Sequence, residues 1–360
     1  MEIKHRLIYI LLPVFLIAGC SQQGDKTYTE EVIEGIRYIH NHAPLWGDET
    51  KVELEFVMQI GDNESEDERY TFRSPSFVSE DRDRNIYIVQ RYPNNRVKKY
   101  TSNGIYLNTF EVTVYDIGID TGLESICIDN NGNLNVCISP PIAGMASELV
   151  TLDQTGKETN RITFEWKLTT EYFVLKNGNI VSEERRDSTL FSMHDKDGKF
   201  LFAFGKRRIY EDKSFTGHRN YFTIDKDDNI YMVYGSQNRL EKYNAEGKLL
   251  FNSDRKLDYE ETIEGKIKYN RPDYNRFSRS IGVDYKGRIW TVTYLKQPDF
   301  EPGKESEGIR KLEIFNSEGI LLGYTDVPDC FDFLFHIYQD HIYFTNIDTD
   351  CVYVYKIVEK

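Results

Sequence analysis

The chain repeats one pattern of apolar and polar positions six times. Each copy has an apolar stretch of strand length, a turn rich in Asp, Asn and Gly, and a second apolar stretch. Asp and Asn tolerate left-handed backbone and Gly adopts positive φ freely, so such turns are typical of β-hairpins. The copies recur about every 50 residues, which is the period of propeller blades. They span residues 77–89, 126–136, 172–181, 221–233, 281–292 and 335–344.

A second hairpin follows the first in most units. In the first unit, residues 96–100 and 105–110 are two stretches of strand length separated by a turn that ends at Gly104. Similar turns lie at 153–156, 194–198, 244–247 and 316–319. Four strands per unit predict an all-β, six-bladed β-propeller with four-stranded blades.

The last unit supplies only three strands, at residues 333–338, 341–345 and 351–357. The alternating stretch 52–60 precedes the first unit and has no partner of its own. We expect it to complete the last blade, because such closure ties the two ends of the ring together. The propeller is therefore predicted to span residues 52–360, with Trp46 packing the preceding segment against it.

The N-terminus has the features of a bacterial export signal. Lys4 and Arg6 precede the apolar run 7–17, which is too short to span a bilayer comfortably. The run ends in Leu-Ile-Ala-Gly-Cys at residues 16–20, which resembles the lipobox of bacterial lipoproteins. This predicts a signal peptide over 1–19, a lipidated Cys20 and a spacer of coil over 20–51; an ordinary signal peptide with a chance Cys is the alternative. Ser21 after the lipidated Cys favours the outer membrane, on either side of it.

The repeat resembles the NHL-type six-bladed propellers over residues 52–358. The shared elements are hydrophobic-Asp-x-x-Gly-Asn-Ile-Tyr-Val and a later Lys-Tyr-x-x-x-Gly. Together with the lipobox and the stretch 41–47, the chain resembles the six-bladed propeller lipoproteins common in gut-type Gram-negative bacteria. The third unit lacks the turn Asp and the sixth is shortened, and the resemblance implies no settled function.

Composition narrows the possible partners. Tyr (25) and Phe (21) are abundant, as suits an all-β chain, and the net charge is −14. An acidic chain without a basic cluster argues against nucleic acid, because binding phosphates needs concentrated Lys and Arg. Cys127 and Cys137 are interpreted as buried free thiols, whereas a bridge between Cys330 and Cys351 is left open.

Strand direction predicts two unlike faces of the disc. The turns within hairpins are short and share one face. The long segments lie at the opposite ends of the strands, at 139–147, 205–218, 254–276 and 296–308. Variable loops on a rigid scaffold usually carry binding, so the long-loop face is the expected binding surface. The strand 52–60 enters from the short-turn side, which predicts that the lipid anchor is on that side.

Candidate ligand-binding residues lie near the starts of the inner strands, where propellers line their central channel. The selected positions are Arg73, Glu124, Glu171, Tyr172, Asn220, Tyr221, Arg279 and Asp332, with Ser125 and Ser280 beside them. Glu124, Asn220 and Asp332 offer oxygens for a calcium ion, the only cofactor considered, but their neighbours do not complete a cage of six or more oxygens. His218 and His336 are interpreted as packed or surface residues, because no third His shares their register.

No catalytic motif is present, which favours binding over catalysis and leaves catalysis open. The leading hypothesis is an envelope-anchored module that binds a peptide, glycan or protein through its long-loop face. One alternative is a lactonase-like, metal-dependent hydrolase or lyase with a site in the channel. The other is a structural subunit of an envelope complex.

Overall fold

The computed structural model describes residues 26–90, 95–114, 122–139, 146–164, 171–183, 189–208, 219–262, 266–268, 271–299, 301, 306–332 and 334–360. For residues 139, 266–268 and 271–273 the structure describes the backbone but not the side chains. The predicted Cys20, His218 and signal peptide lie outside these ranges. In the described part of the chain every regular element is a β-strand. No helix there is long and apolar enough to cross a membrane.

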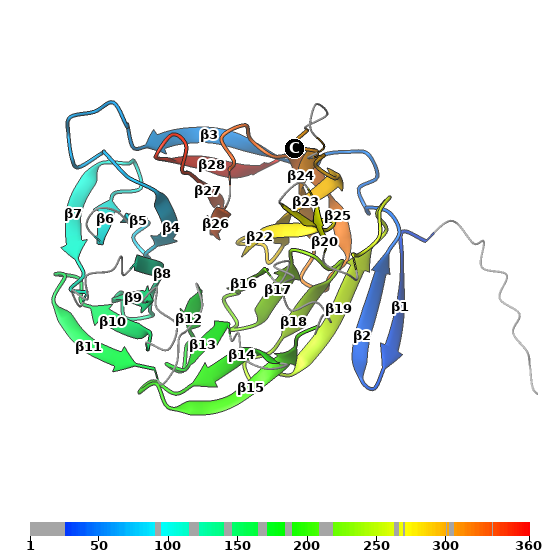
Figure 1. The fold of residues 1–360 in the computed structure, drawn as a ribbon, viewed down its shortest axis with the longest axis horizontal. Coiled ribbons are helices and arrows are strands. Elements are labelled where there is room, and N and C mark those ends of the chain that lie inside the picture. The colour runs from blue at the N-terminus through cyan, green and yellow to red at the C-terminus, as the bar shows by residue number, and fades with distance from the viewer. Residues whose placement is uncertain are drawn as a thin grey trace, which may run out of the picture.

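Six antiparallel sheets surround a central axis, as Figure 1 shows, so the predicted six-bladed propeller is confirmed. Blades one to three contain β4 (Pro75–Glu80), β5 (Ile86–Gln90), β6 (Arg96–Tyr100) and β7 (Tyr106–Glu111); β8 (Gly122–Ile128), β9 (Leu134–Ser139), β10 (Glu148–Leu152) and β11 (Glu158–Thr163); and β12 (Tyr172–Val174), β13 (Ile180–Glu183), β14 (Thr189–His194) and β15 (Phe200–Lys206). Blades four to six contain β16 (Asn220–Ile224), β17 (Ile230–Tyr234), β18 (Leu240–Tyr243) and β19 (Leu249–Arg255); β22 (Ser278–Val283), β23 (Ile289–Lys296), β24 (Ile309–Phe315) and β25 (Leu321–Asp326); and β26 (Leu334–Tyr338), β27 (His341–Asn346), β28 (Cys351–Glu359) and β3 (Val52–Ile60).

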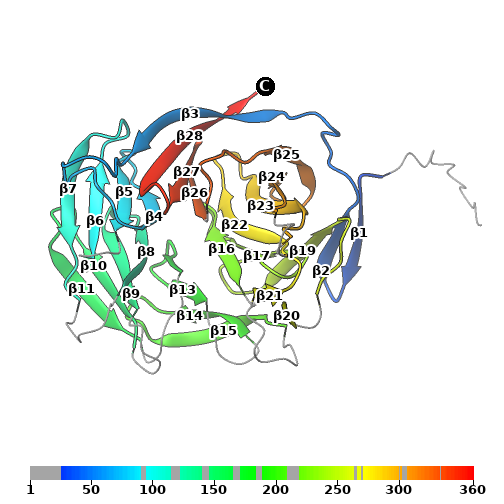
Figure 2. The same cartoon turned by 45° about the horizontal axis from the view of Figure 1, so that its top comes forward.

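The last blade is closed by the N-terminal strand, as predicted. β3 pairs antiparallel with β28, from Val352 opposite Ile60 to Glu359 opposite Val52. Figure 2 shows the two strands side by side at the rim of the ring. Because β3 and β28 come from opposite ends of the chain, their backbone hydrogen bonds join the first and last parts of the propeller.

The turn Asp explains why the repeat forms hairpins. In the first blade the Asp81 carboxylate accepts hydrogen bonds from the backbone N–H of Asn85 at 2.8 Å and from the Tyr87 hydroxyl at 3.0 Å. The same carboxylate therefore fixes the turn and one end of the next strand. Asp225 accepts from Tyr231 in the fourth blade. In the third blade Leu175 takes the place of this Asp and keeps only the backbone bonds of the turn.

The segment before β3 differs from the predicted coil spacer. Residues 28–41 form a hairpin of β1 (Tyr28–Ile33) and β2 (Ile36–Asn41), joined at Glu34 and Gly35, which both have positive φ. β2 pairs in parallel with β19, so the fourth sheet has six strands, and Figure 1 shows the hairpin outside that blade. The expectation of coil is wrong here, and the direction of β3 no longer determines which face lies nearest to Cys20.

Residues after the hairpin continue around the rim to the fifth blade. The N–H groups of Leu45 and Trp46 donate to the carbonyls of Leu321 and Leu322. A Cβ added at Gly323 would lie 2.5 Å from the Trp46 ring, so the indole packs directly on the backbone of β25. This confirms the predicted packing of Trp46 against the propeller.

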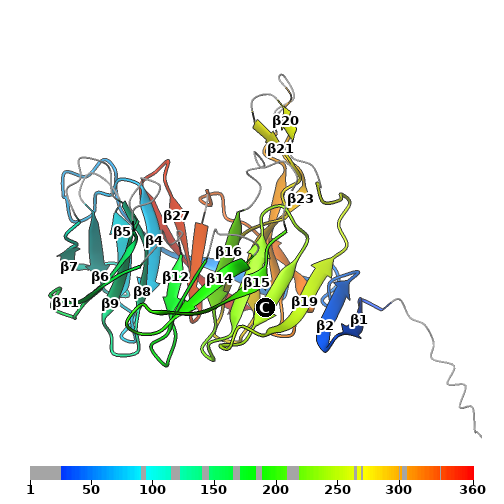
Figure 3. The same cartoon turned by 60° about the horizontal axis from the view of Figure 1, so that its bottom comes forward.

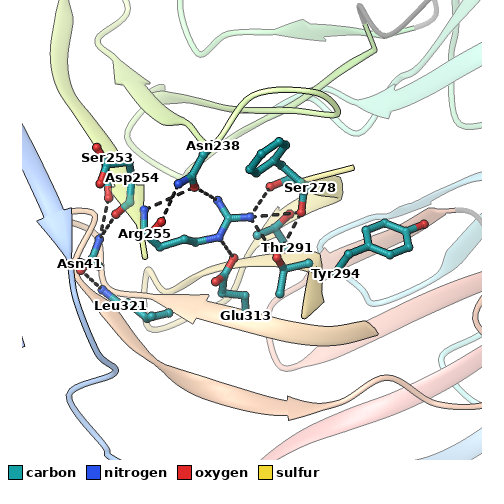
Figure 4. A network of polar contacts seen from close by, with 12 residues as sticks. Asn41, Asn238, Ser253, Asp254, Arg255, Ser278, Thr291, Tyr294, Glu313 and Leu321 are labelled. Carbon is teal, nitrogen blue, oxygen red and sulfur yellow. Dashed lines mark hydrogen bonds and ion pairs between the residues drawn. The ribbon is translucent and has the colours of Figure 1, made fainter. Parts of the chain in front are cut away.

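A buried polar network joins the hairpin to blades four and five (Figure 4). Arg255, at the end of β19, forms a 2.7 Å ion pair with Glu313 of β24, and both side chains are at most 1 % exposed. The guanidinium also donates to Asn238 Oδ1, to the Phe277 carbonyl and to the hydroxyls of Ser278 and Thr293, at 3.0–3.1 Å. Most donors of this buried cation therefore have acceptors.

Asn41 extends the same region to the N-terminal hairpin. Its side-chain amide donates to Ser253 Oγ and to the carbonyls of Asp254 and Gly319, and its carbonyl oxygen accepts from Leu321 N–H at 2.8 Å. One side chain thus connects three segments that lie far apart in the sequence.

The long loops of the sequence are described only in part. A small hairpin of β20 (Lys266–Lys268) and β21 (Arg271–Asp273) projects from one face of the disc in Figure 3. It belongs to the connection between β19 and β22, so it lies within the predicted long segment 254–276. Other parts of the long segments lie outside the described residues.

All four described cysteines are free. Cys127 and Cys137 are buried thiols, as predicted. Cys330 lies by the Tyr355 hydroxyl, whereas Cys351 contacts Gln59 and Thr349. Cys330 and Cys351 are therefore not bridged in this structure.

Candidate functional site

The centre of the ring contains a cavity of about 720 Å³. All six inner strands, β4, β8, β12, β16, β22 and β26, contribute to its wall. The cavity extends to the short turns of blades four to six, at residues 225–227, 284–287 and 339. It is therefore a channel that reaches the short-turn side of the disc.

One ring of the wall follows directly from the repeat. Each inner strand places a residue in the lining at the position four before the turn Asp or its equivalent. These residues are Phe77, Ser125, Glu171, Tyr221, Ser280 and Leu334. Apolar side chains surround the ring, including Ile126, Phe173, Ile224, Val283 and Ile337. The wall is thus apolar with a few polar groups placed at defined heights.

Glu171 is the acidic member of this ring. Burial, together with the negative charge of the neighbouring Glu183, raises the pKa of Glu171 to about 8, although the backbone N–H of Phe222 donates to it. Its carboxyl group is therefore protonated at neutral pH and can donate as well as accept a hydrogen bond.

Polar residues of blades three to five gather beside Glu171. The Asn220 amide donates to the Glu183 carboxylate at 3.2 Å. The Arg219 guanidinium donates to the Tyr221 hydroxyl, and burial raises the pKa of Tyr221 although the charges of Arg279 and Arg219 lower it. The cluster combines two acids, two guanidiniums and a phenol at one end of the channel.

Four lining residues have a buried polar atom without a hydrogen-bond partner among the described residues: Glu80, Ser125, Tyr172 and His336. Glu80 is ion-paired with Arg84 and Tyr172 packs on the Cys127 thiol, so Ser125 Oγ on β8 and His336 Nε2 on β26 are the two without such a neighbour. Both residues line the cavity, and Ser125 is only 3 % exposed. By contrast, Ser280 occupies the same repeat position as Ser125, and its hydroxyl donates to the Phe335 carbonyl at 2.9 Å and accepts from Phe335 N–H. The two matched serines therefore differ in whether the protein provides a hydrogen-bond partner for the hydroxyl group.

The ring of His336 is fixed by its neighbours. One ring nitrogen bonds to the backbone of Ser76, and the Phe77 ring lies 5.5 Å away, centroid to centroid. Burial lowers the pKa of His336 to about 4, so the imidazole is neutral at pH 7. With the Ser76 carbonyl accepting from Nδ1–H, Nε2 carries a lone pair and acts as an acceptor.

The predicted site residues fall into two groups. Glu171, Tyr172 and Tyr221 line the cavity. Tyr172 is buried and also packs on the thiol of Cys127. Glu124, Asn220 and Arg279 come one residue before a ring member and are not part of the lining. Successive side chains of a strand point to opposite sides, which accounts for this difference.

Arg73 and Asp332 lie before the inner strands of blades one and six and are likewise outside the lining. Arg73 is exposed, whereas Asp332 is partly buried and its Oδ2 atom has no partner among the described residues. The prediction that these two residues bind a ligand is not tested by the geometry of the cavity.

The calcium prediction finds no donor set in the described residues. No group of three or more His, Cys, Asp or Glu side chains is arranged to hold a metal there. Asn220 donates its amide to Glu183, and no contact joins it to Glu124 or Asp332 in the described contacts. The oxygens considered for calcium therefore do not fit a hard cation site as placed.

Sequence reasoning missed His336, which was interpreted as packed or surface, and assigned no function to Ser125. Counting back from the turn would have found both, because His336 lies two and Ser125 four positions before the Asp or its equivalent. Whether their polar atoms have protein partners depends on neighbouring blades and cannot be counted from the repeat.

No family model and no curated protein matches the chain. Among solved structures, a luciferin-regenerating enzyme is 12 % identical with a TM-score of 0.50, covering 85 % of this chain and 95 % of that one. Virginiamycin B lyase from Staphylococcus aureus is 12 % identical with a TM-score of 0.49, covering 86 % and 100 %. A protein of unknown function from Bacteroides caccae is 12 % identical with a TM-score of 0.48, covering 70 % and 81 %. These similarities show the fold alone.

Proposed function

We propose that this chain is an envelope lipoprotein that binds a small molecule in the central channel of its propeller. The observation that carries the proposal is the cavity of about 720 Å³, lined by all six inner strands. Binding sites for small molecules have volumes of about 300–1,000 Å³ and a mainly apolar wall with a few placed polar groups. The channel has both properties.

The channel gives the binding hypothesis a location other than the long-loop face. Most long segments lie partly outside the described residues, so binding of a peptide, glycan or protein there stays a prediction. The channel is built from residues of the repeat, which fixes its wall on rigid strands. Rigid walls favour a single small ligand, because little side-chain entropy is lost on binding.

The lipid anchor at Cys20 belongs to this proposal. Seven residues, 21–27, separate Cys20 from β1, and an extended chain of that length spans about 25 Å. The hairpin beside blade four would then hold the rim of the disc close to the outer membrane. Labelling with a palmitate analogue should mark the wild-type chain and leave the Cys20→Ala variant unlabelled; equal labelling of both would contradict lipidation.

Small-molecule binding can be tested on protein purified from its own envelope. Ile224→Trp places a large ring in the wall of the channel and serves as the blocked control. Native mass spectrometry should show a mass adduct on the wild-type protein that is absent from the blocked variant. The proposal would be contradicted if the wild-type protein had no adduct, or if both proteins had the same adduct.

The catalytic alternative has one specific observation in its favour. Glu171 lines the channel and keeps its proton near neutral pH, which is the state required of a general acid. If the channel catalyses hydrolysis or elimination, Glu171→Gln should abolish turnover while leaving the bound adduct in place. A bound molecule that is released unchanged by both proteins would favour binding alone.

A further inference from the structure

The channel wall also indicates the chemical class of its ligand, an inference that rests on the proposed function. Among the lining residues with an unpartnered polar atom, Glu80 has an ion pair with Arg84 and Tyr172 contacts the Cys127 thiol, which leaves His336 and Ser125. β26 and β8, which carry His336 and Ser125, both pack against β4 between them. The two atoms therefore belong to blades that flank the first blade.

His336 presents an acceptor toward this side of the channel. The backbone of Ser76 and the ring of Phe77 hold the imidazole, and the buried Nε2 atom has no hydrogen-bond partner among the described residues. A buried acceptor without a donor destabilises the protein, because it has lost its hydration and gained no hydrogen bond in exchange. A ligand that brings a hydroxyl or N–H group to this position removes that cost.

The rest of the wall near these atoms is uncharged or apolar. Ile126, Ile337 and Leu334 line the channel beside Ser125 and His336. Glu171, on the third blade next to that of Ser125, holds its proton at neutral pH. A charged ligand would lose its hydration there without gaining a counter-charge, which disfavours ions strongly.

One charged group of the wall is already paired. Glu80 lines the channel, but Arg84 lies 3.4 Å from its carboxylate and the Tyr343 hydroxyl donates to it. Lys226, Lys242 and Lys286 lie at the short-turn end. Asp225, Asp227 and Asp284 lie at the same end, so apart from Glu80 and Glu171 the charged residues of the lining are at the short-turn mouth.

We propose that the channel selects an uncharged small molecule with an apolar body of ring size and a single hydroxyl or N–H group, which donates a hydrogen bond to His336 Nε2. The Ser125 hydroxyl is the second group within the same part of the wall and can donate to an oxygen of the ligand. The apolar residues of the wall then select the ligand by its shape, and the hydrogen bond to His336 fixes its orientation.

Four naphthalene probes of similar size separate these properties. 2-Naphthol carries a donor, 2-methoxynaphthalene carries none, 2-naphthoate is an anion and 1-naphthylmethylamine is a cation at pH 7. Binding to the intact protein in detergent is measured by fluorescence titration, with the blocked Ile224→Trp protein as the blank for partition into micelles. We expect 2-naphthol to bind at least tenfold more tightly than the ether and both ions to bind more weakly still.

Variants of His336 test the contact itself. His336→Phe keeps a ring beside Phe77 but removes the acceptor, so the affinities for 2-naphthol and its ether should become equal within about twofold, with the ether unchanged. His336→Gln restores an acceptor and should recover part of the preference. A wild-type protein that binds the ether or an ion as tightly as the naphthol overturns the ligand class while keeping the channel as a binding site. Absence of any binding above the blocked control overturns this inference, whereas the proposed function is judged separately by the native adduct.

Discussion

Two groups of buried polar residues in this propeller differ in how many polar contacts the protein supplies to them. Between blades four and five, the buried Arg255 pairs with Glu313 at 2.7 Å, and its terminal nitrogens donate to four acceptors on neighbouring segments. In the channel, Ser125 and His336 have buried polar atoms without partners among the described residues. Satisfied polar groups lock elements together, whereas unsatisfied ones cost stability and need another reason to be present.

Ser125 and Ser280 allow the same comparison at a single position of the repeat. Ser280 joins β22 to β26 through both of its hydrogen bonds to Phe335, whereas Ser125 has none among the described residues. Both lie four residues before the turn Asp, but Ser280, at an irregularity of β22, has a positive φ of 60° and Ser125 does not, so the backbone differs at this position too. The comparison separates residues that build the ring from residues that the ring presents to a ligand.

The largest expected effect is in the buried ion pair. Arg255→Met leaves Glu313 buried without its partner, and removing one member of such a pair costs about 3–5 kcal/mol. Denaturant unfolding should show this loss, while Arg73→Met on the exposed surface should stay within about 0.5 kcal/mol of wild type. The double variant Arg255→Met, Glu313→Leu should recover much of the loss; a single variant as stable as wild type would show that the pair does not join the blades.

The next effect concerns the N-terminal hairpin. Asn41→Ala leaves the N–H of Leu321 without its partner and removes one of the two donors to the carbonyl of Gly319, at a cost of about 2 kcal/mol. Hydrogen exchange of β1 and β2 should accelerate in this variant. Asn160→Ala, at an exposed position of the outer strand β11, is the control and should change neither quantity. Unchanged exchange in Asn41→Ala would mean that the hairpin is held by backbone pairing alone.

The matched serines should separate stability from binding. Ser280→Ala removes both contacts with Phe335 and should lower the free energy of unfolding by about 1–2 kcal/mol. Ser125→Ala removes a buried hydroxyl without a partner and should leave stability unchanged or higher, while weakening the binding of 2-naphthol. Equal losses of stability in the two variants would remove the distinction between them.

The last effect is a change in how stability depends on pH. The native pKa of Glu171 is about 8 and lies above its ordinary value of 4.5, so the native state holds this proton more tightly than the unfolded state. Its contribution to stability is complete below pH 4.5 and is lost as the pH rises through 8. Glu171→Gln cannot lose this proton, so its unfolding free energy should fall less than that of wild type between pH 5 and 9. Parallel curves for the two proteins would show that Glu171 titrates normally.

Much of the fold follows from local patterns in the sequence. Turns of the Asp-x-x-x-Asn type with an aromatic residue two positions later identify the hairpins, and the odd strand 52–60 identifies the closure. The hairpin β1–β2 was missed because its partner β19 lies more than 200 residues away and pairs in parallel. Nothing in the local pattern of residues 28–41 specifies that contact.

The sequence predicted only part of the site, because the phase of the inner strands was counted from the wrong end. Glu171 and Tyr221 occupy the ring position and line the channel, while Glu124, Asn220 and Arg279 are one residue out of phase. Counting from the turn Asp rather than from the start of each strand corrects this phase. The polar atoms of His336 and Ser125 required the structure, because their lack of partners depends on three different blades.

The central claim is that the unpartnered polar atoms of the channel are present for a ligand. It is tested most directly by thermal unfolding of wild type and His336→Phe, each with and without 2-naphthol. Without the probe, the variant should melt only slightly lower than wild type, because it loses the ring contact with Ser76 but also removes the unpartnered Nε2 atom. With the probe, wild type should gain several degrees and the variant much less, because binding to the native state alone raises stability. A variant that melts far lower without the probe, or that gains as much as wild type with it, would contradict the account.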